Sequence, residues 1–152
     1  MPRAGFYAIH NSSIRFGRDG RWYADGQLIT NARIADLFSR HVQRDPDGTY
    51  RLRIADEQAA IEVEDTPYVV IAADSDVGQP WVELNDRSRE PLDVTSLAIG
   101  GDDVLYCRVK EGREPARFLR PAYYQVADHI EAAPGGGFVF RAGARRHPIG
   151  RR

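Results

Sequence analysis

The chain has 152 residues, of which 42% are hydrophobic, and a formal net charge of −1. A chain of this size and composition can fill the core of one domain or of two small, packed domains. It contains no apolar run near the ~20 residues that span a bilayer. Its first residues, MPRAGFYAIHNSS, lack the basic-then-apolar layout of a signal peptide. We therefore expect a cytoplasmic protein with no membrane partner.

The single cysteine and the charge balance exclude several classes of site. Cys107 alone can form neither an intrachain disulfide nor a multi-thiolate metal site, and its alternating apolar neighbours favour a small core residue over a nucleophile. The near-zero net charge provides no global field that attracts nucleic acid. Lys110 is the only lysine among 21 basic residues, and five of the arginines, Arg141, Arg145, Arg146, Arg151 and Arg152, crowd the C-terminus.

The first predicted elements are a small hairpin and a helix. Residues 14–16 and 21–24 are typical of two short strands joined by a turn at Asp19-Gly20. Thr30 or Asn31 can cap a following helix. The apolar residues of that helix recur at steps of three and four and are Ile34, Leu37, Phe38 and Val42. We expect them to face the core.

A β-meander is the most strongly patterned run of the chain. Residues 50–54 and 61–65 alternate apolar and charged side chains, and a third apolar run covers 69–73. A register that sets Leu52 opposite Val63 matches apolar with apolar and Arg with Glu. This pattern predicts an antiparallel pair joined by a loop over residues 55–60.

A polar stretch with Gly and Pro at residues 74–80 indicates the boundary between two halves, 1–79 and 80–152. The second half has a strand pattern at 104–110. Pro121 suits the first turn of a helix that continues through Val126 and Ile130. A strand follows at 138–141. The run IADLF from Ile34 superposes on VADHI from Val126, which suggests a duplication.

Several motifs resemble those of a bacterial family, the domain of unknown function 1285 family. They cover nearly the whole chain and are DGRWYADGQLI from Asp19, DGTYRL from Asp47, IEVEDTPYV from Ile61, EPARFLRPAYYQVAD from Glu114 and RAG from Arg141. The resemblance implies an α+β fold of two similar halves, each an antiparallel sheet packed with one helix. It also implies a second half loosely similar to pleckstrin-homology domains and a ligand groove between the halves. No established activity accompanies it.

Common catalytic motifs are missing from the sequence. There is no Walker A loop, Rossmann glycine pattern, nucleophile elbow or HExxH helix. The four histidines have no metal-ligand spacing. We therefore predict no catalytic residue, no metal and no cofactor.

Five residues are candidates for lining the predicted groove. They combine aromatic surface with convergent polar groups and are Trp22, Asp65, Arg117, Arg120 and Tyr124. Arginine forks suit a phosphate or carboxylate, while Asp65 can orient a base or hydroxyl. The alternative is structural, with Asp65 accepting turn N–H groups and the arginines forming salt bridges beside packed tyrosines.

These observations favour a ligand-binding or regulatory, signal-transduction module for a small anionic or nucleotide-like ligand. One alternative is an enzyme of unrecognised type that uses Asp65 or Glu64 as a base. Another is a protein-interaction module that offers a sheet edge or its arginine-rich C-terminus to a partner. The oligomeric state stays open.

Overall fold

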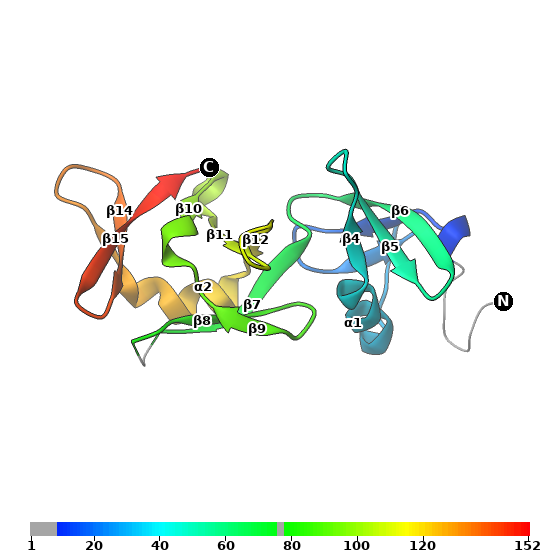
Figure 1. The fold of residues 1–152 in the computed structure, drawn as a ribbon, viewed down its shortest axis with the longest axis horizontal. Helices are drawn as coiled ribbons and strands as arrows, with labels where there is room; N and C mark the ends of the chain where they lie inside the picture. Colours follow the sequence, from blue (N-terminus) through cyan, green and yellow to red (C-terminus); the bar gives the residue numbers. More distant parts are fainter. Residues whose placement is uncertain (1–8, 76–77) are drawn as a thin grey trace. The chain divides into compact units, whose positions relative to one another are not determined.

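The computed structural model describes residues 9–75 and 78–152 (Figure 1). Residues 1–8, which carry most of the segment tested for a signal peptide, and Asp76 and Val77 of the polar stretch lie outside this description. The chain divides into two compact units, residues 1–67 and 68–152. The division comes earlier than the sequence suggested, because the strand at 68–74 pairs within the second sheet.

Unit 1 contains one six-stranded sheet in the order β3-β2-β1-β6-β5-β4. Its elements are a 3-10 turn (Ile9–Asn11), β1 (Ile14–Phe16), β2 (Trp22–Ala24), β3 (Gln27–Leu28), α1 (Ala32–Arg40), β4 (Val42–Arg44), β5 (Tyr50–Ile54) and β6 (Glu57–Val63). The predicted hairpin is confirmed, since Ile14 pairs with Ala24. The sheet is mixed rather than antiparallel, because β1 also lies parallel to β6.

Helix α1 begins after Asn31, one of the two caps that the sequence offered. The side chain of Asn31 accepts hydrogen bonds from the N–H groups of Arg33 (3.0 Å) and Ile34 (3.3 Å), two donors that the first turn leaves without a helical acceptor. Ile34 and Phe38 are buried and Leu37 is half-buried. The expectation for Val42 is wrong, because the helix ends at Arg40 and Val42 starts β4.

Strands β5 and β6 are antiparallel, as predicted, but in another register. Leu52 lies opposite Ala59 and Tyr50 opposite Ile61, so the Leu52–Val63 pairing is wrong. The cause is the turn, because Ile54 pairs with Glu57 and only two residues connect the strands. Ala55 adopts a left-handed φ of 55° to close that turn.

The core of unit 1 is aromatic. The ring of Trp22 packs 4.7 Å from that of Phe16 and 5.5 Å from that of Phe38, between centroids. Its indole N–H donates to Ser39 Oγ at 3.0 Å, which satisfies the one polar atom that the ring buries. These contacts join α1 to the sheet.

Unit 2 contains one nine-stranded sheet in the order β13-β14-β15-β10-β11-β12-β7-β8-β9. Its strands are β7 (Tyr68–Asp74), β8 (Trp81–Leu84), β9 (Arg89–Pro91), β10 (Ala98–Ile99), β11 (Leu105–Val109), β12 (Glu114–Phe118), β13 (Ile130–Ala132), β14 (Phe138–Ala142) and β15 (Arg145–Arg151). Two pairs, β7–β12 and β10–β15, are parallel. Three 3-10 turns cover Val94–Ser96, Gly101–Asp103 and Ala127–His129.

Helix α2 (Arg120–Val126) packs against β7. Ala122 and Val126 are buried on its inner face, and Gln125 accepts a hydrogen bond from the N–H of Ala73 at 2.8 Å. Cys107 lies in the same core at 2% exposure, which confirms its interpretation as a core residue.

The proposed superposition of IADLF on VADHI is wrong in detail. Ile34 belongs to the first turn of α1, whereas Val126 is the last residue of α2. Ile130 starts β13 and is half-buried. The short similarity arose because apolar residues four apart occur both in helices and where a helix passes into a strand.

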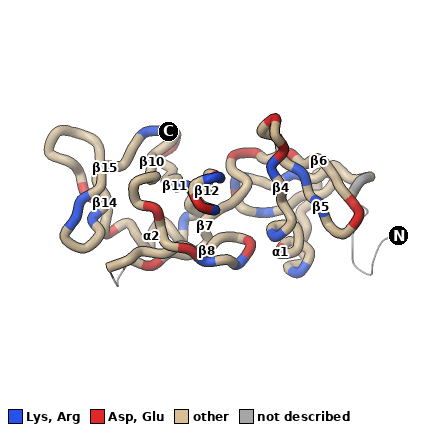
Figure 2. The backbone as a smooth tube through the Cα atoms, viewed as in Figure 1, with Lys and Arg blue, Asp and Glu red and all other residues tan. Residues whose placement is uncertain are grey.

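The predicted class is confirmed, since each unit combines one sheet with one α-helix. The loose likeness of the second half to pleckstrin-homology domains stays a prediction. No helix among the described residues is long and apolar enough to cross a membrane. Figure 2 shows the charged residues, including the C-terminal arginines on β14 and β15.

Candidate ligand-binding pocket

The structure assigns Trp22 to the core of unit 1. Its side chain is 1% exposed and is enclosed by Phe16, Phe38 and Ser39. The expectation that Trp22 lines a groove is therefore wrong. The alternation that placed it on a hairpin strand is correct, but its inward face is covered by α1.

The two carboxylates considered as bases follow β6. Glu64 accepts a hydrogen bond from the N–H of Arg18 at 2.8 Å and forms ion pairs with Arg18 (3.4 Å) and Arg15 (3.8 Å). The Arg18 backbone N–H, with the two guanidinium groups, lowers the pKa of Glu64. A carboxylate stabilised in its ionised form is a weak proton acceptor at neutral pH. Asp65 beside it is half-buried.

The other three predicted residues all belong to unit 2. Arg117 on β12 is half-buried, and its Nη1 donates to the hydroxyl of Tyr106 on β11 at 3.3 Å. Arg120 is exposed at the start of α2, and Tyr124 is 66% exposed on the same helix, with its ring 5.9 Å from that of Tyr123. The groove between the halves stays a prediction.

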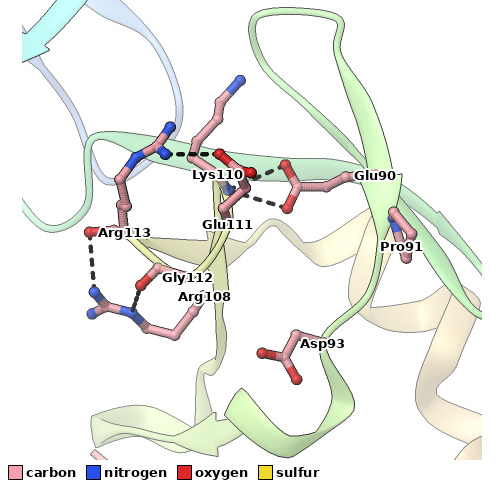
Figure 3. A pocket seen from close by; sticks show the side chains of 8 residues that line it. All are labelled: Glu90, Pro91, Asp93, Arg108, Lys110, Glu111, Gly112 and Arg113. Atoms are coloured by element: carbon pink, nitrogen blue, oxygen red, sulfur yellow. Dashed lines mark hydrogen bonds and ion pairs between the residues drawn. The ribbon is translucent and has the colours of Figure 1, made fainter.

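A pocket in unit 2 lies elsewhere, between the β11–β12 loop and the strand β9 (Figure 3). It is an open cavity of ≈ 520 Å³. Its lining residues are Glu90, Pro91, Asp93, Arg108, Lys110, Glu111, Gly112 and Arg113. Three carboxylates and three cations thus surround one hollow.

The loop that forms one wall has an unusual backbone. Lys110, Glu111 and Gly112 have φ values of 55°, 58° and 79°, so three successive residues are left-handed. Glycine adopts this conformation freely, but it is unfavourable for lysine and glutamate. Such strain persists only where surrounding contacts hold it.

Two side chains hold this loop from the pocket side. The carboxylate of Glu90 on β9 accepts the N–H of Lys110 through both oxygens, at 3.1 and 3.2 Å. Arg108 donates from Nε to the carbonyl of Gly112 at 3.1 Å and from Nη2 to the carbonyl of Arg113 at 3.0 Å. The wall is therefore fixed before any ligand arrives.

Lys110 anchors the loop from the other side. Its Nζ lies 2.6 Å from Asp86 Oδ2 and 3.1 Å from Ser88 Oγ, on the β8–β9 turn, and 5.0 Å from the centre of the Tyr68 ring. Burial opposes ionisation of Asp86, but hydrogen bonds from Lys110 and Ser88 outweigh it and lower the pKa of the carboxyl. Burial, and then the charge of Asp86, raise the pKa of Tyr68 to about 12, so its hydroxyl stays protonated.

Several polar groups around the hollow keep hydrogen-bonding capacity. Arg113 uses only Nη1, on Glu111 at 2.8 Å, and Arg108 keeps Nη1 unused among the described residues. Asp93 uses Oδ1 to cap the turn through Thr95. Figure 3 shows the two arginines on one side of the hollow and Asp93 with Glu90 on the other. The site can therefore accept an anionic group and hydrogen-bond donors together.

Two other chemistries find little support. Residues 9–75 and 78–152 contain no group of three His, Cys, Asp or Glu side chains placed to hold a metal ion. Burial raises the pKa of the Cys107 thiol to about 12, so it stays protonated and unreactive.

Sequence reasoning missed every residue of this pocket. Two signals pointed towards it: Lys110 is the only lysine, and Glu111-Gly112 follows a strand pattern as a turn would. Neither signal indicates that β9 lies against that turn, because the two segments are about twenty residues apart.

Comparisons with known proteins find a matching family model and similar solved structures but no activity. Residues 7–66 match the family model "Domain of unknown function (DUF1285), N-terminal domain". No curated protein matches the chain. The predicted resemblance is thus confirmed.

Two solved structures share the fold. A DUF1285 family protein from Silicibacter pomeroyi DSS-3 is 20% identical with a TM-score of 0.70, over 90% of this chain and 79% of its own. A DUF1285 family protein from Shewanella baltica OS155 is 20% identical with a TM-score of 0.60, over 78% of this chain and 92% of its own. At this identity the likeness concerns the fold alone.

Proposed function

We propose that this chain, whose residues 7–66 match the DUF1285 N-terminal domain model, is a small-molecule binding module and that the unit 2 pocket is its ligand site. One observation carries the proposal. The strained loop Lys110–Gly112 is held in place by contacts from the β8–β9 turn, β9 and β11 at the edge of a cavity. Strained backbone that is clamped on several sides is typical of binding sites.

The charges of the pocket indicate the class of ligand. Arg113 and Arg108 offer guanidinium N–H groups that suit a phosphate or carboxylate. Asp93 and Glu90 offer acceptors for hydroxyl or amino groups across the hollow. A nucleotide-like ligand carries both features, in agreement with the small anionic ligand expected from the sequence.

A preformed site also explains why several side chains hold the Lys110–Gly112 loop in place. A ligand that meets a rigid wall loses less free energy to loop ordering than one that must fix the loop itself. Binding would then report the concentration of a metabolite, as a regulatory or signalling module requires.

The test is calorimetric titration with adenosine monophosphate and with inorganic phosphate. Arg113→Gln should weaken binding of the nucleotide at least tenfold, because a charged hydrogen bond contributes about 1.5–3 kcal/mol. Arg33→Gln, an exposed change on α1 that lies outside the pocket and outside the C-terminal arginines, is the control and should leave binding unchanged. Equal affinities of both variants and the parent would contradict the assignment of this pocket.

A further inference from the structure

The last three strands concentrate positive charge. Residues 130–152 contain five arginines and one carboxylate, Glu131, which gives a formal charge of +4 (5 − 1) in a chain of net charge −1. Three of the arginines, Arg141, Arg145 and Arg146, lie around the β14–β15 turn (Figure 2). The pocket uses none of them.

Two of these arginines are held side by side. Arg141 and Arg146 lie directly opposite each other on β14 and β15, an arrangement that is destabilising for like charges. Glu131 on β13 offsets part of the repulsion, because its two oxygens accept from Arg141 Nε (2.9 Å) and Arg146 Nε (3.2 Å). The pairing lowers the pKa of Glu131 through Arg141 first and Arg146 second, so it stays ionised.

The shared carboxylate leaves the outer nitrogens available. Both terminal nitrogens of Arg146 have no partner among the described residues, and its side chain is 60% exposed. Arg141 keeps Nη1, while its Nη2 donates to the carbonyl of Asp128 at 3.1 Å. Arg145, exposed beside the turn, forms no ion pair with any described residue. The carboxylate of Glu131 therefore orients the guanidinium groups of Arg141 and Arg146. The guanidinium group of Arg145 lies beside them.

The surrounding surface indicates which kind of polyanion fits. Phe138 is the only exposed large hydrophobic side chain on β13–β15 within the described part of the chain. A stable protein interface needs an apolar core, and membrane binding needs a broad apolar face. This surface therefore suits neither a protein partner nor a membrane. Planar guanidinium forks match phosphate oxygens, and phosphates alone can supply the affinity for nucleic acid.

We propose that strands β13, β14 and β15 bind nucleic acid through its phosphate groups, with Arg141, Arg145 and Arg146 as the contacts and Glu131 as the residue that orients two of them. This site is separate from the pocket and does not depend on its ligand. Because the chain as a whole has a net charge of −1, we expect nucleic acid to bind only at this positively charged surface. The contacts carry no base recognition, so affinity should vary little with sequence.

The experiment is fluorescence anisotropy of the full chain with a labelled single-stranded oligonucleotide and the corresponding duplex, from 50 to 200 mM salt. Arg145→Glu with Arg146→Glu should weaken binding at least tenfold at 50 mM salt. Loss of two phosphate contacts should also reduce the slope of log affinity against log salt by about 1.4 for the single strand and about 1.8 for the duplex. The oligonucleotide that binds more tightly, single strand or duplex, is the form of nucleic acid that this surface prefers.

Two controls make the result decisive. Arg33→Glu with Arg40→Glu reverses the same number of exposed arginines on α1 and should change affinity less than twofold. Arg145→Gln with Arg146→Gln, a milder pair for use if the reversed variant unfolds, should weaken binding at least threefold. Absence of binding at 50 mM salt, an equal loss in the α1 control, or displacement by polyglutamate as effective per charge as by unlabelled oligonucleotide would each overturn the proposal.

Discussion

At the residue scale, the most informative side chain is Lys110. It is the only lysine in a chain that otherwise uses arginine, and the structure places its compact ammonium group between Asp86, Ser88 and the ring of Tyr68. A planar guanidinium would need more space and more acceptors than this half-buried position offers. The choice of lysine thus agrees with a structural anchor beneath the pocket loop.

The anchor predicts a pH-dependent stability. Asp86 has a folded pKa below its ordinary value of 3.8, so its ionised form stabilises the fold. That contribution is complete well above pH 3.8 and is lost as the pH falls through the lower folded pKa. Asp86→Asn should lower the free energy of unfolding at pH 7 by about 1–3 kcal/mol and should make it depend less on pH between 7 and 3.

Urea unfolding at pH 7 and at pH 3 measures both effects. The same change at exposed Asp102 is the control and should leave the stability at pH 7 within about 0.5 kcal/mol. A variant at Asp86 that loses stability on acidification as steeply as the parent would show that another group carries the pH dependence.

At the element scale, the β5–β6 hairpin shows that the alternation of side chains and the pairing register have different causes. Both candidate registers bury Leu52 and expose Arg53, because they differ by an even number of residues. Alternation therefore identified the strands and their faces, while the two-residue turn at Ala55-Asp56 selected the pairing. Matched charges across the strands were a weaker determinant than the turn.

Engineered disulfides distinguish the two registers. Arg53→Cys with Gln58→Cys replaces two exposed, directly opposed residues and should oxidise readily, because cross-strand pairs meet the distance that a disulfide requires. Arg53→Cys with Glu62→Cys represents the other register and should stay reduced. Thiol titration in denaturant should find one free thiol, that of Cys107, in the first variant and three in the second.

At the scale of the whole molecule, β7 decides the domain boundary. The strand lies between β12 and β8 inside the nine-stranded sheet and supports α2 through the Ala73–Gln125 hydrogen bond. Its sequence continues the meander of unit 1, so composition alone assigned it to the first half. The pairing within the second sheet places it in unit 2.

Fragments test this assignment. Residues 68–152 should give a dispersed amide NMR spectrum, because the fragment keeps every strand of its sheet. Residues 80–152 lack β7 and should be unfolded, since β12 and β8 lose their shared neighbour and Val70 and Ala73 leave the core. A folded shorter fragment would favour the later boundary.

The sequence by itself determined the properties that depend on local pattern. These are the α+β class, a helix cap at Thr30 or Asn31, the first hairpin, the inward face of the strand around Cys107 and the family resemblance. Each follows from the spacing of apolar side chains or from short motifs, which neighbouring residues largely specify. The arginine-rich C-terminus was also visible as composition.

Only the tertiary structure decided the properties that depend on contacts between segments far apart in the sequence. The β1–β6 and β7–β12 parallel pairs, the burial of Trp22 beneath α1 and the pocket between β9 and the β11–β12 loop all join residues far apart in the chain. No local pattern encodes which distant strand becomes a neighbour, because many pairings bury the same apolar faces. The choice depends on the packing of all strands and both helices together.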